Sequence, residues 1–164
     1  MKCRLVKLTQ LSGNRASIYS IVLNDESKTI FEKFLRAHRN SFKSETKDLL
    51  MRLKTIGGKT GAKASFFKSH EGKYGDGVCA LYDSPGKKLR LYCIRYGTPL
   101  IIVGSGGPKS KTIRALQEDA ILTKENYFLR WLAEEIGKRI QNKEIEYINN
   151  YQDFEGNFEF VIPQ

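Results

Sequence analysis

The chain has 164 residues, of which 40% are hydrophobic and 28% charged, and its formal net charge at pH 7 is +10. A chain of this length buries roughly 68–70% of its unfolded surface, which is enough for one self-sufficient core. The composition excludes a disordered chain, and the sequence has no apolar run of about 18 residues, which excludes a helical membrane span. Residues 1–8 also lack the apolar block of a signal peptide, so we expect a soluble, cytoplasmic protein.

The three cysteines do not indicate a disulfide framework or a zinc site. Cys3, Cys79 and Cys93 are odd in number and widely separated, and the chain has only two histidines. We therefore expect the cysteines to act as small apolar side chains in a reducing compartment, and we expect no metal and no cofactor.

Charge is distributed unevenly along the chain. Residues 57–116 carry 11 basic and 3 acidic side chains, whereas residues 117–164 carry 5 basic and 10 acidic ones. A basic field of this kind favours encounters with polyanions such as RNA. The alternative is a solvated lysine-rich surface without a partner.

The first part of the chain predicts a β-hairpin followed by two helices. Residues 3–8 and 17–23 are rich in strand-forming side chains and are separated by a turn-forming cluster. Thr29 and Glu32 match a capping box at the start of the first helix. The second helix is predicted over residues 41–56 and should end at the glycine pair 57–58.

The middle of the chain predicts a sheet. A basic loop over residues 57–63 precedes four short segments with strand-like patterns, which are residues 66–68, 78–82, 89–96 and 100–103. Tight-turn residues separate the last three, which therefore predict an antiparallel meander.

The C-terminal part predicts a short helix over residues 112–121, a long helix over 123–141 and an acidic tail over 144–164. The tail has five acidic and no basic residues, and its pattern predicts a short hairpin or an edge strand around Gly156. It could lie along the basic face as an internal mimic of RNA, or it could be a solvated hairpin. We therefore predict one α+β domain over residues 1–143, followed by this tail.

A glycine-rich segment, residues 104–112, follows a predicted strand and precedes a predicted helix. It is not a phosphate-binding P-loop, because Pro108 interrupts the required Gly-Lys pair. Exposed N–H groups in such a loop, beside Lys109 and Lys111, would favour an anion such as an RNA phosphate. The alternative is a plain connection between a strand and a helix.

Alternation along residues 89–96 places Arg90 and Tyr92 on the face opposite Leu89, Leu91 and Cys93. A guanidinium could bind a phosphate there, and a phenol could stack on a base. The alternative is a sheet face that the third helix covers.

The order of these elements and two short motifs resemble the RelE/ParE toxin superfamily, and its HigB-like branch in particular. The motifs are the strand KLRLYCIRY, residues 88–96, and the segment LIIVGSGGPKSKTIRA, residues 100–115. The matching positions are Arg90, Tyr92, Gly107, Lys109, Lys111 and Ala115, and the resemblance covers about residues 29–121. It implies a RelE-like fold, in which a helical hairpin packs on a small antiparallel sheet. The N-terminal β-hairpin, the C-terminal helix and the acidic tail would be additions to that fold.

The resemblance implies the toxin of a bacterial type II toxin-antitoxin pair, which cuts mRNA on the ribosome without a metal. Its partners would be ribosome-bound mRNA and a helix-turn-helix antitoxin. The expected catalytic residues are Arg90, Tyr92, Lys109 and His70, although a lone loop histidine such as His70 is more often simply solvated. The expected RNA-binding residues are Lys59, Lys63, Lys68, Lys87, Lys88, Lys111 and Arg114. Two alternatives stay open: a non-catalytic module of the same fold that binds nucleic acid or a protein, and a ParE-like toxin that acts on gyrase.

Overall fold

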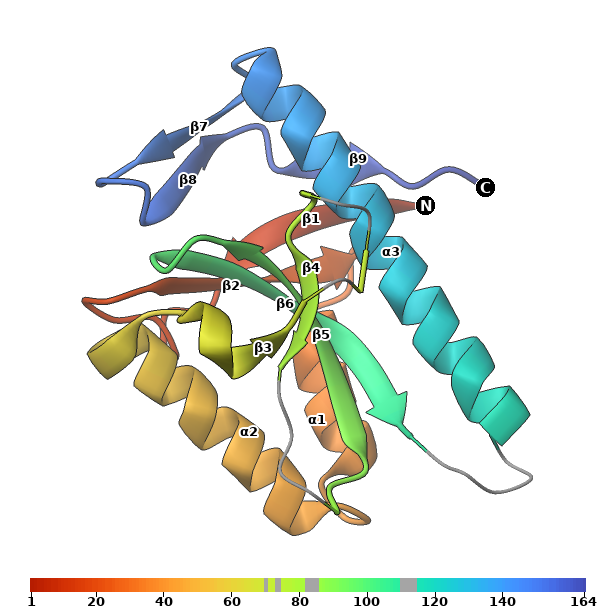
Figure 1. Ribbon diagram of the computed structural model, residues 1–164. Coiled ribbons are helices and arrows are strands. Elements are labelled where there is room, and N and C mark those ends of the chain that lie inside the picture. The colour runs from red at the N-terminus through yellow and green to blue at the C-terminus, as the bar shows by residue number, and fades with distance from the viewer. Residues whose placement is uncertain (70, 73–74, 82–85, 110–114) are drawn as a thin grey trace.

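The computed structural model describes residues 1–69, 71–72, 75–81, 86–109 and 115–164, with the side chains of 115–119 left aside. Within this part of the chain, seven strands form one sheet in the order β3-β4-β5-β6-β2-β1-β9 (Figure 1). The strands are β1 (Lys2–Lys7), β2 (Ser17–Leu23), β3 (Phe67–Lys68), β4 (Val78–Leu81), β5 (Leu89–Tyr96), β6 (Leu100–Pro108) and β9 (Glu159–Val161). The chain is therefore an α+β protein, as predicted.

The sheet is mixed rather than antiparallel. The predicted hairpin β1–β2 and the predicted meander β4–β5–β6 are both present, and they are joined because β2 pairs with β6 in parallel. All residues of β2 except Leu23 are buried, which is typical of a central strand enclosed on both faces. The N-terminal hairpin is thus part of the main sheet and not an addition beside it.

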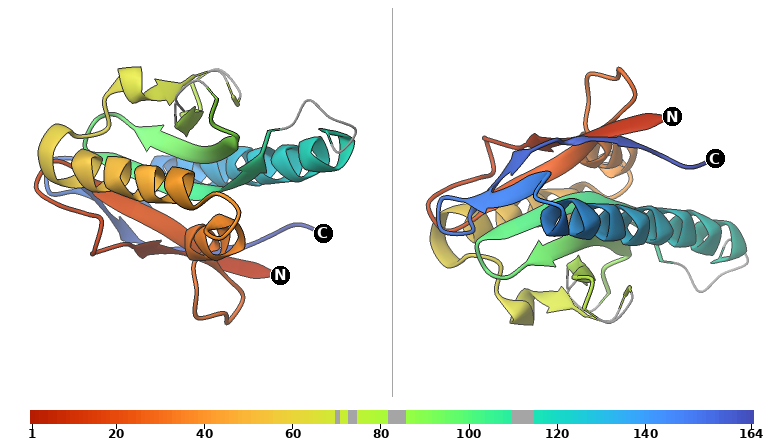
Figure 2. Two further views of the ribbon diagram at one scale, coloured as in Figure 1. Left: turned by 90° about the horizontal axis from the view of Figure 1, so that it is seen from below. Right: turned by 90° about the horizontal axis from the view of Figure 1, so that it is seen from above.

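Helices cover both faces of the sheet (Figure 2). Helix α1 (Ile30–His38) and helix α2 (Lys43–Thr55) pack on one face, and helix α3 (Ala115–Gln141) packs on the other. The alternating strand residues divide between these layers: Leu91 and Cys93 belong to the core under α1 and α2, and Tyr92 to the core under α3. The predicted alternation along β5 is confirmed, and the Tyr92 face is the one that the third helix covers.

The start of α1 is as predicted, whereas the glycine pair after α2 does not act as predicted. The Thr29 hydroxyl accepts a hydrogen bond from the Glu32 N–H at 3.1 Å, which confirms the predicted helix start. Helix α2 ends at Thr55, one residue before the predicted end, but the glycine pair 57–58 does not stop the helical path, because a π-helix, η1 (Ile56–Thr60), follows directly. The Gly57 carbonyl accepts hydrogen bonds from the N–H groups of Arg15 and Ala16, which hold η1 against the β1–β2 connection.

The two helices predicted after residue 111 are a single helix within the described residues. Helix α3 begins at Ala115 and continues without a break to Gln141, where a break near residue 122 was expected. Its buried residues, Leu122, Leu129, Leu132 and Ile136, pack on the sheet and continue one stripe along the helix. The apolar contact along this stripe explains why the helix is continuous.

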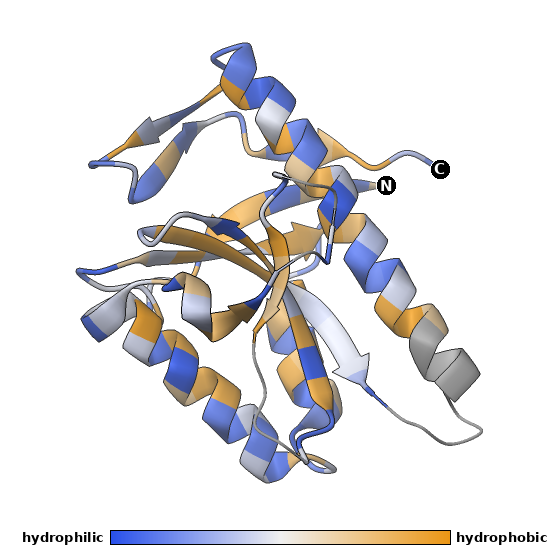
Figure 3. Ribbon diagram, viewed as in Figure 1, coloured by the Kyte–Doolittle hydropathy of each residue, from blue (hydrophilic) through white to orange (hydrophobic). Residues whose placement is uncertain are grey.

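The acidic tail is built into the domain. It forms a hairpin of β7 (Ile145–Ile148) and β8 (Asp153–Gly156), and β9 then pairs with β1 at the edge of the main sheet. Phe160 is 2% exposed and lies in the core under α3. In Figure 3 the central strands are mainly hydrophobic, whereas the β7–β8 hairpin is mainly hydrophilic with a few hydrophobic residues. The edge strand predicted after Gly156 is present as β9, whereas the hairpin turn lies earlier, at residues 149–152. Within the described residues the tail packs on the domain and its edge strand pairs with β1, so it is not a solvated appendage.

Candidate nucleic-acid interface

One end of β5 and β6 gathers four of the predicted basic residues. The N–H groups of Lys88 and Leu89 donate to the Glu45 carboxylate at the start of α2, which fixes the beginning of β5. The Lys109 N–H donates to the Lys88 carbonyl at 2.6 Å, so these two residues lie side by side at the ends of neighbouring strands. We refer to Lys87, Lys88, Arg90 and Lys109 as the basic end of the sheet.

A polar groove of about 430 Å³ continues from this end between β5 and the N-terminal half of α3. Arg90 and Tyr92 line it from β5, and Glu71 lines it from the segment after β3. Helix α3 contributes its other wall, formed by Leu122, Thr123, Asn126, Tyr127 and Arg130. We call this cavity the β5–α3 groove.

Two contacts set the shape of the groove. The Asn126 amide donates to the Glu71 carbonyl at 2.7 Å, and this bond ties α3 to the segment after β3. The Arg130 guanidinium lies 4.9 Å from the centre of the Tyr127 ring, within the range of a cation–π contact. Tyr127 is 59% exposed, so the outer part of the groove presents an aromatic face beside a cation.

This arrangement has the chemistry of a nucleotide site. Arginine side chains from two elements, Arg90 and Arg130, can bind a phosphate through charge-assisted hydrogen bonds. An exposed tyrosine ring can stack on an unpaired base, as in proteins that bind single-stranded RNA. Tyr92, by contrast, is only 4% exposed under α3, and so little of its ring is open to a ligand.

The glycine segment after residue 103 has a different role from the one predicted. Residues 104–107 are part of β6 and pair with β5, so they do not form an open anion-binding loop at a helix start. A Cβ atom on Gly104 would lie 2.8 Å from Cδ1 of Leu129, and one on Gly106 would collide with the Arg90 carbonyl. The glycines therefore allow α3 and β5 to approach β6 closely.

The other predicted residues are not all near the groove. Lys59 and Lys63 flank a segment that is bonded to the turn between β5 and β6, where the Ala62 N–H donates to the Thr98 carbonyl at 2.8 Å. This turn is at the opposite end of an eight-residue strand, or about 25 Å from the basic end. Lys68 lies 3.9 Å from the Glu71 carboxylate. His70, Lys111 and Arg114 lie outside the described residues.

The α3 wall of the groove was not predicted from the sequence. The signal that could have revealed it is a second stripe on the helix, in which Thr123, Asn126 and Arg130 recur at intervals of three and four beside the buried leucines. A polar stripe next to an apolar one is ordinary for a surface helix. That this stripe faces Arg90 across a groove depends on how α3 packs against β5, which the sequence pattern does not contain.

The described part of the chain holds no cluster of metal ligands, and its cysteines are buried. Among those residues, no three His, Cys, Asp or Glu side chains are grouped so that they could hold a metal ion. The cysteines are buried and free, and burial raises the pKa of the Cys3 thiol to about 11 and the pKa of the Cys79 thiol to about 12. No helix in the described ranges is long and apolar enough to span a membrane.

Comparisons of the chain with protein-family models, with curated proteins and with solved structures found no match.

Proposed function

We propose that this protein is a RelE-like ribonuclease toxin that binds mRNA in the β5–α3 groove and at the basic end of the sheet. The observation that carries the proposal is the pairing of Arg90 with Arg130 across one groove, beside the exposed ring of Tyr127 and next to Lys88 and Lys109. The element order also supports it, since a helical pair followed by an antiparallel meander and a further helix agrees with the resemblance drawn from the motifs.

The proposed reaction is attack of a ribose 2′-oxygen on the adjacent phosphorus, with release of the 5′-oxygen of the next nucleotide. A base removes the 2′-hydroxyl proton, and an acid returns a proton to the leaving oxygen. Arg90 and Lys109 stabilise the charge of the phosphorane, and Arg130 is placed to assist them. His70 and Tyr92 remain the candidates for proton transfer, while the ribosome holds the strand in position.

This proposal includes the partners that the resemblance implies. The substrate is mRNA on the bacterial ribosome, the compartment is the cytoplasm, and a helix-turn-helix antitoxin neutralises the toxin. No metal ion takes part in the proposed reaction.

The alternative is a non-catalytic module of the same fold that binds RNA or a protein partner. The burial of Tyr92 favours it, because a phenol that is 4% exposed must move, or α3 must move, before it can transfer a proton to RNA. In this alternative the groove binds a strand and does not cut it.

Induced expression in a bacterial host separates these functions. We expect the wild-type chain to stop growth and to produce new 5′ ends in mRNA, whereas an Arg90→Ala, Lys109→Ala variant should do neither. The matched control is Lys2→Ala, Lys143→Ala, which removes two exposed cations elsewhere and should behave like the wild type. Intact mRNA and normal growth with the wild-type chain would reject the nuclease and leave the binding module. DNA damage without mRNA cleavage would select the gyrase-directed alternative.

A further inference from the structure

The C-terminal half of β6 extends beyond the strand that flanks it on one side (Figure 1). β2 pairs with β6 only over residues 100–102, whereas β5 pairs with β6 along its whole length, with one irregularity. β2 leaves β6 at Ser20, whose hydroxyl donates to the Val103 carbonyl at 2.8 Å. Residues 104–108, or about 17 Å of strand, therefore have no described strand beside them on this side.

This edge of β6 presents backbone groups of Gly106. The Lys109 N–H donates to the Lys88 carbonyl, so these two residues are a hydrogen-bonded pair of the antiparallel ladder. Such pairs alternate along a ladder, so Gly107 bonds to Arg90, while the N–H and C=O of Gly106 point away from β5. Gly106 is buried, and a buried backbone donor and acceptor without a partner cost free energy that a bound strand would recover.

A cavity of about 570 Å³ lies beside this edge, between α1 and α3. Ser105 and Gly106 line it from β6, the two helices form its walls, and Leu23 lies opposite, at the end of β2. Its volume is within the range of sites that bind ligands. We call this cavity the β6 groove.

Both walls of the β6 groove are mainly apolar. Phe34 and Ala37 contribute to one wall from α1, and Ile121 and Phe128 contribute to the other from α3. Phe34 is buried, but Phe128 is half-buried and Ile121 is 49% exposed, so part of this apolar surface is uncovered. A strand beside β6 would direct alternate side chains toward α1 and toward α3, so each wall would receive an apolar side chain.

The charged groups at the β6 groove balance one another. Lys33 pairs with Glu26 at 2.7 Å. Burial raises the pKa of the Glu125 carboxyl, while the charges of Lys124 and Lys33 act to lower it, so two lysines face two acidic groups. Burial also lowers the pKa of His38, which favours a neutral ring at pH 7. The groove therefore does not attract a polyanion such as RNA, in contrast to the basic end of the sheet.

We propose that the β6 groove binds an extended, apolar segment of a partner protein, which adds to the sheet as a strand beside β6. Its backbone pairs with the N–H and C=O of Gly106, and its side chains enter the two apolar walls in alternation. The unpaired edge favours a polypeptide, because an extended backbone supplies a donor and an acceptor at the spacing of a β-ladder. The balanced charge favours an uncharged segment over a charged one.

This proposal does not depend on the ribonuclease function. The β6 groove and the β5–α3 groove share no lining residue, and so a peptide and RNA can be bound together.

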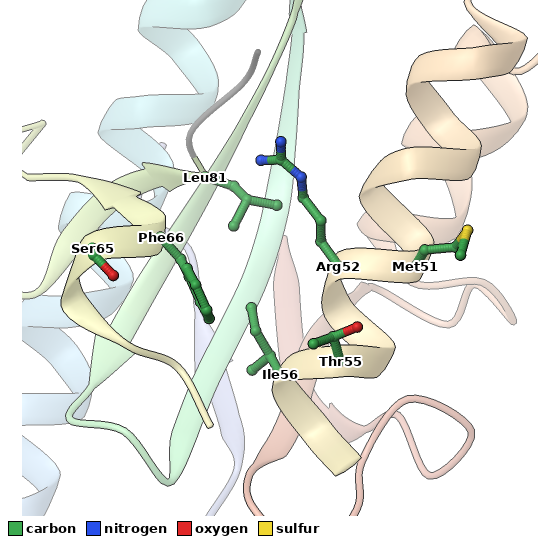
Figure 4. A pocket seen from close by; sticks show the side chains of 7 residues that line it. All are labelled: Met51, Arg52, Thr55, Ile56, Ser65, Phe66 and Leu81. Atoms are coloured by element: carbon green, nitrogen blue, oxygen red, sulfur yellow. The ribbon is translucent and has the colours of Figure 1, made fainter. Parts of the chain in front are cut away.

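The test uses a phage-displayed library of random peptides selected against the full-length protein, and the affinities of the selected peptides are measured by fluorescence anisotropy. Ala37→Trp fills the groove from an exposed position of α1, and Ile121→Glu places a charge in the α3 wall. The matched controls, Thr55→Trp and Met51→Glu, lie at a separate cavity of about 440 Å³ between α2 and the region of β3 and β4 (Figure 4). Circular dichroism verifies that each variant is folded.

We expect the selected peptides to carry apolar side chains at neighbouring positions. Ala37→Trp and Ile121→Glu should each weaken their binding about tenfold or more, and the two α2 controls should weaken it less than about threefold. N-methylation of the peptide backbone should weaken binding at alternate positions only, because every second N–H of a strand faces β6. Amide hydrogen exchange of Gly106 should slow about tenfold or more on binding relative to that of Gly107, which is already bonded to Arg90.

Several results would overturn the proposal. It fails if no peptide is enriched, if the α2 controls weaken binding as much as the groove variants, or if N-methylation is tolerated at every position. Unchanged exchange of the Gly106 amide in the complex would also reject strand addition at β6. Displacement of the peptides by saturating single-stranded RNA would instead assign the groove to nucleic acid.

Discussion

Replacement of Asp153 by Asn should show that the acidic tail is part of the folded domain. The Asp153 carboxylate accepts hydrogen bonds from the Ser17 hydroxyl at 2.7 Å and from the Asn149 amide at 3.0 Å, and it pairs with the Lys7 ammonium at 2.9 Å. Lys7 and Ser17 connect the β7–β8 hairpin to β1 and β2, whereas the bond from Asn149 lies within the hairpin. An asparagine at this position keeps the shape of the side chain but loses its charge.

The pKa of Asp153 gives the size of the effect. Burial acts to raise this pKa, but hydrogen bonds from Asn149, Ser17 and Lys7, together with the charge of Lys7, lower it from 3.8 to about 2. Asp153 is 9% exposed, so solvent screens these interactions little, and a decrease of this size corresponds to about 2 kcal/mol in the free energy of unfolding. Because the folded-state pKa is depressed, this stabilisation is fully present above pH about 4 and is lost as the pH falls through about 2.

Urea unfolding followed by circular dichroism at pH 7 and at pH 2 measures this difference. We expect Asp153→Asn to lower the free energy of unfolding by about 2–3 kcal/mol at pH 7 and to differ little from the wild type at pH 2. Asp25→Asn, at an exposed position, is the control and should change the free energy by about 0.5 kcal/mol or less. Equal effects of Asp153→Asn at both pH values would refute the electrostatic explanation.

Three further predictions concern the helix, the groove and the tail. Gly104→Ala should lower the free energy of unfolding by about 1–3 kcal/mol, because its Cβ would press on Leu129; an unchanged urea midpoint would contradict the close packing of α3 on β6. Tyr127→Ala should weaken binding of single-stranded RNA by about 1–3 kcal/mol in a fluorescence titration and leave thermal unfolding unchanged, and equal affinity would remove the ring from the interface. Deletion of residues 144–164 should abolish cooperative unfolding, because it removes the buried side chains of this segment and the strand that pairs with β1. A truncated protein that stays folded and binds RNA more tightly would contradict this and support the tail as an RNA mimic.

Local patterns predicted the elements of this fold better than their arrangement. The capping residues at Thr29, the alternation along β5 and the apolar stripe of α3 depend on near neighbours, and each is present in the structure. The parallel pairing of β2 with β6 joins segments about 80 residues apart, and no local pattern encodes it. The same holds for β9, which reaches the sheet edge beside β1 at the other end of the chain.

In the candidate site, too, single residues were predicted better than their arrangement in space. The sequence pointed to Arg90 and Lys109, and the structure brings them to one end of the sheet. The sequence did not reveal that Gly104 allows α3 to pack closely on β6. A glycine-rich segment is compatible with a loop as well as with a close approach of two elements. Arg130 was missed because its partner across the groove is contributed by β5, which lies far away in the sequence.

The measurement that tests the account most directly is the salt dependence of RNA binding by the wild-type chain and an Arg90→Ala, Arg130→Ala variant. For a single strand of about 20 nucleotides, each phosphate contact contributes a slope of roughly −0.7 in a plot of log affinity against log salt concentration. We predict a steep negative slope for the wild type and, for the variant, weaker binding with a slope flatter by about 1.4 units. A Lys2→Ala, Lys143→Ala control should keep the wild-type slope. A flat salt response of the wild type, or identical slopes for the wild type and the arginine variant, would contradict an RNA interface in the β5–α3 groove.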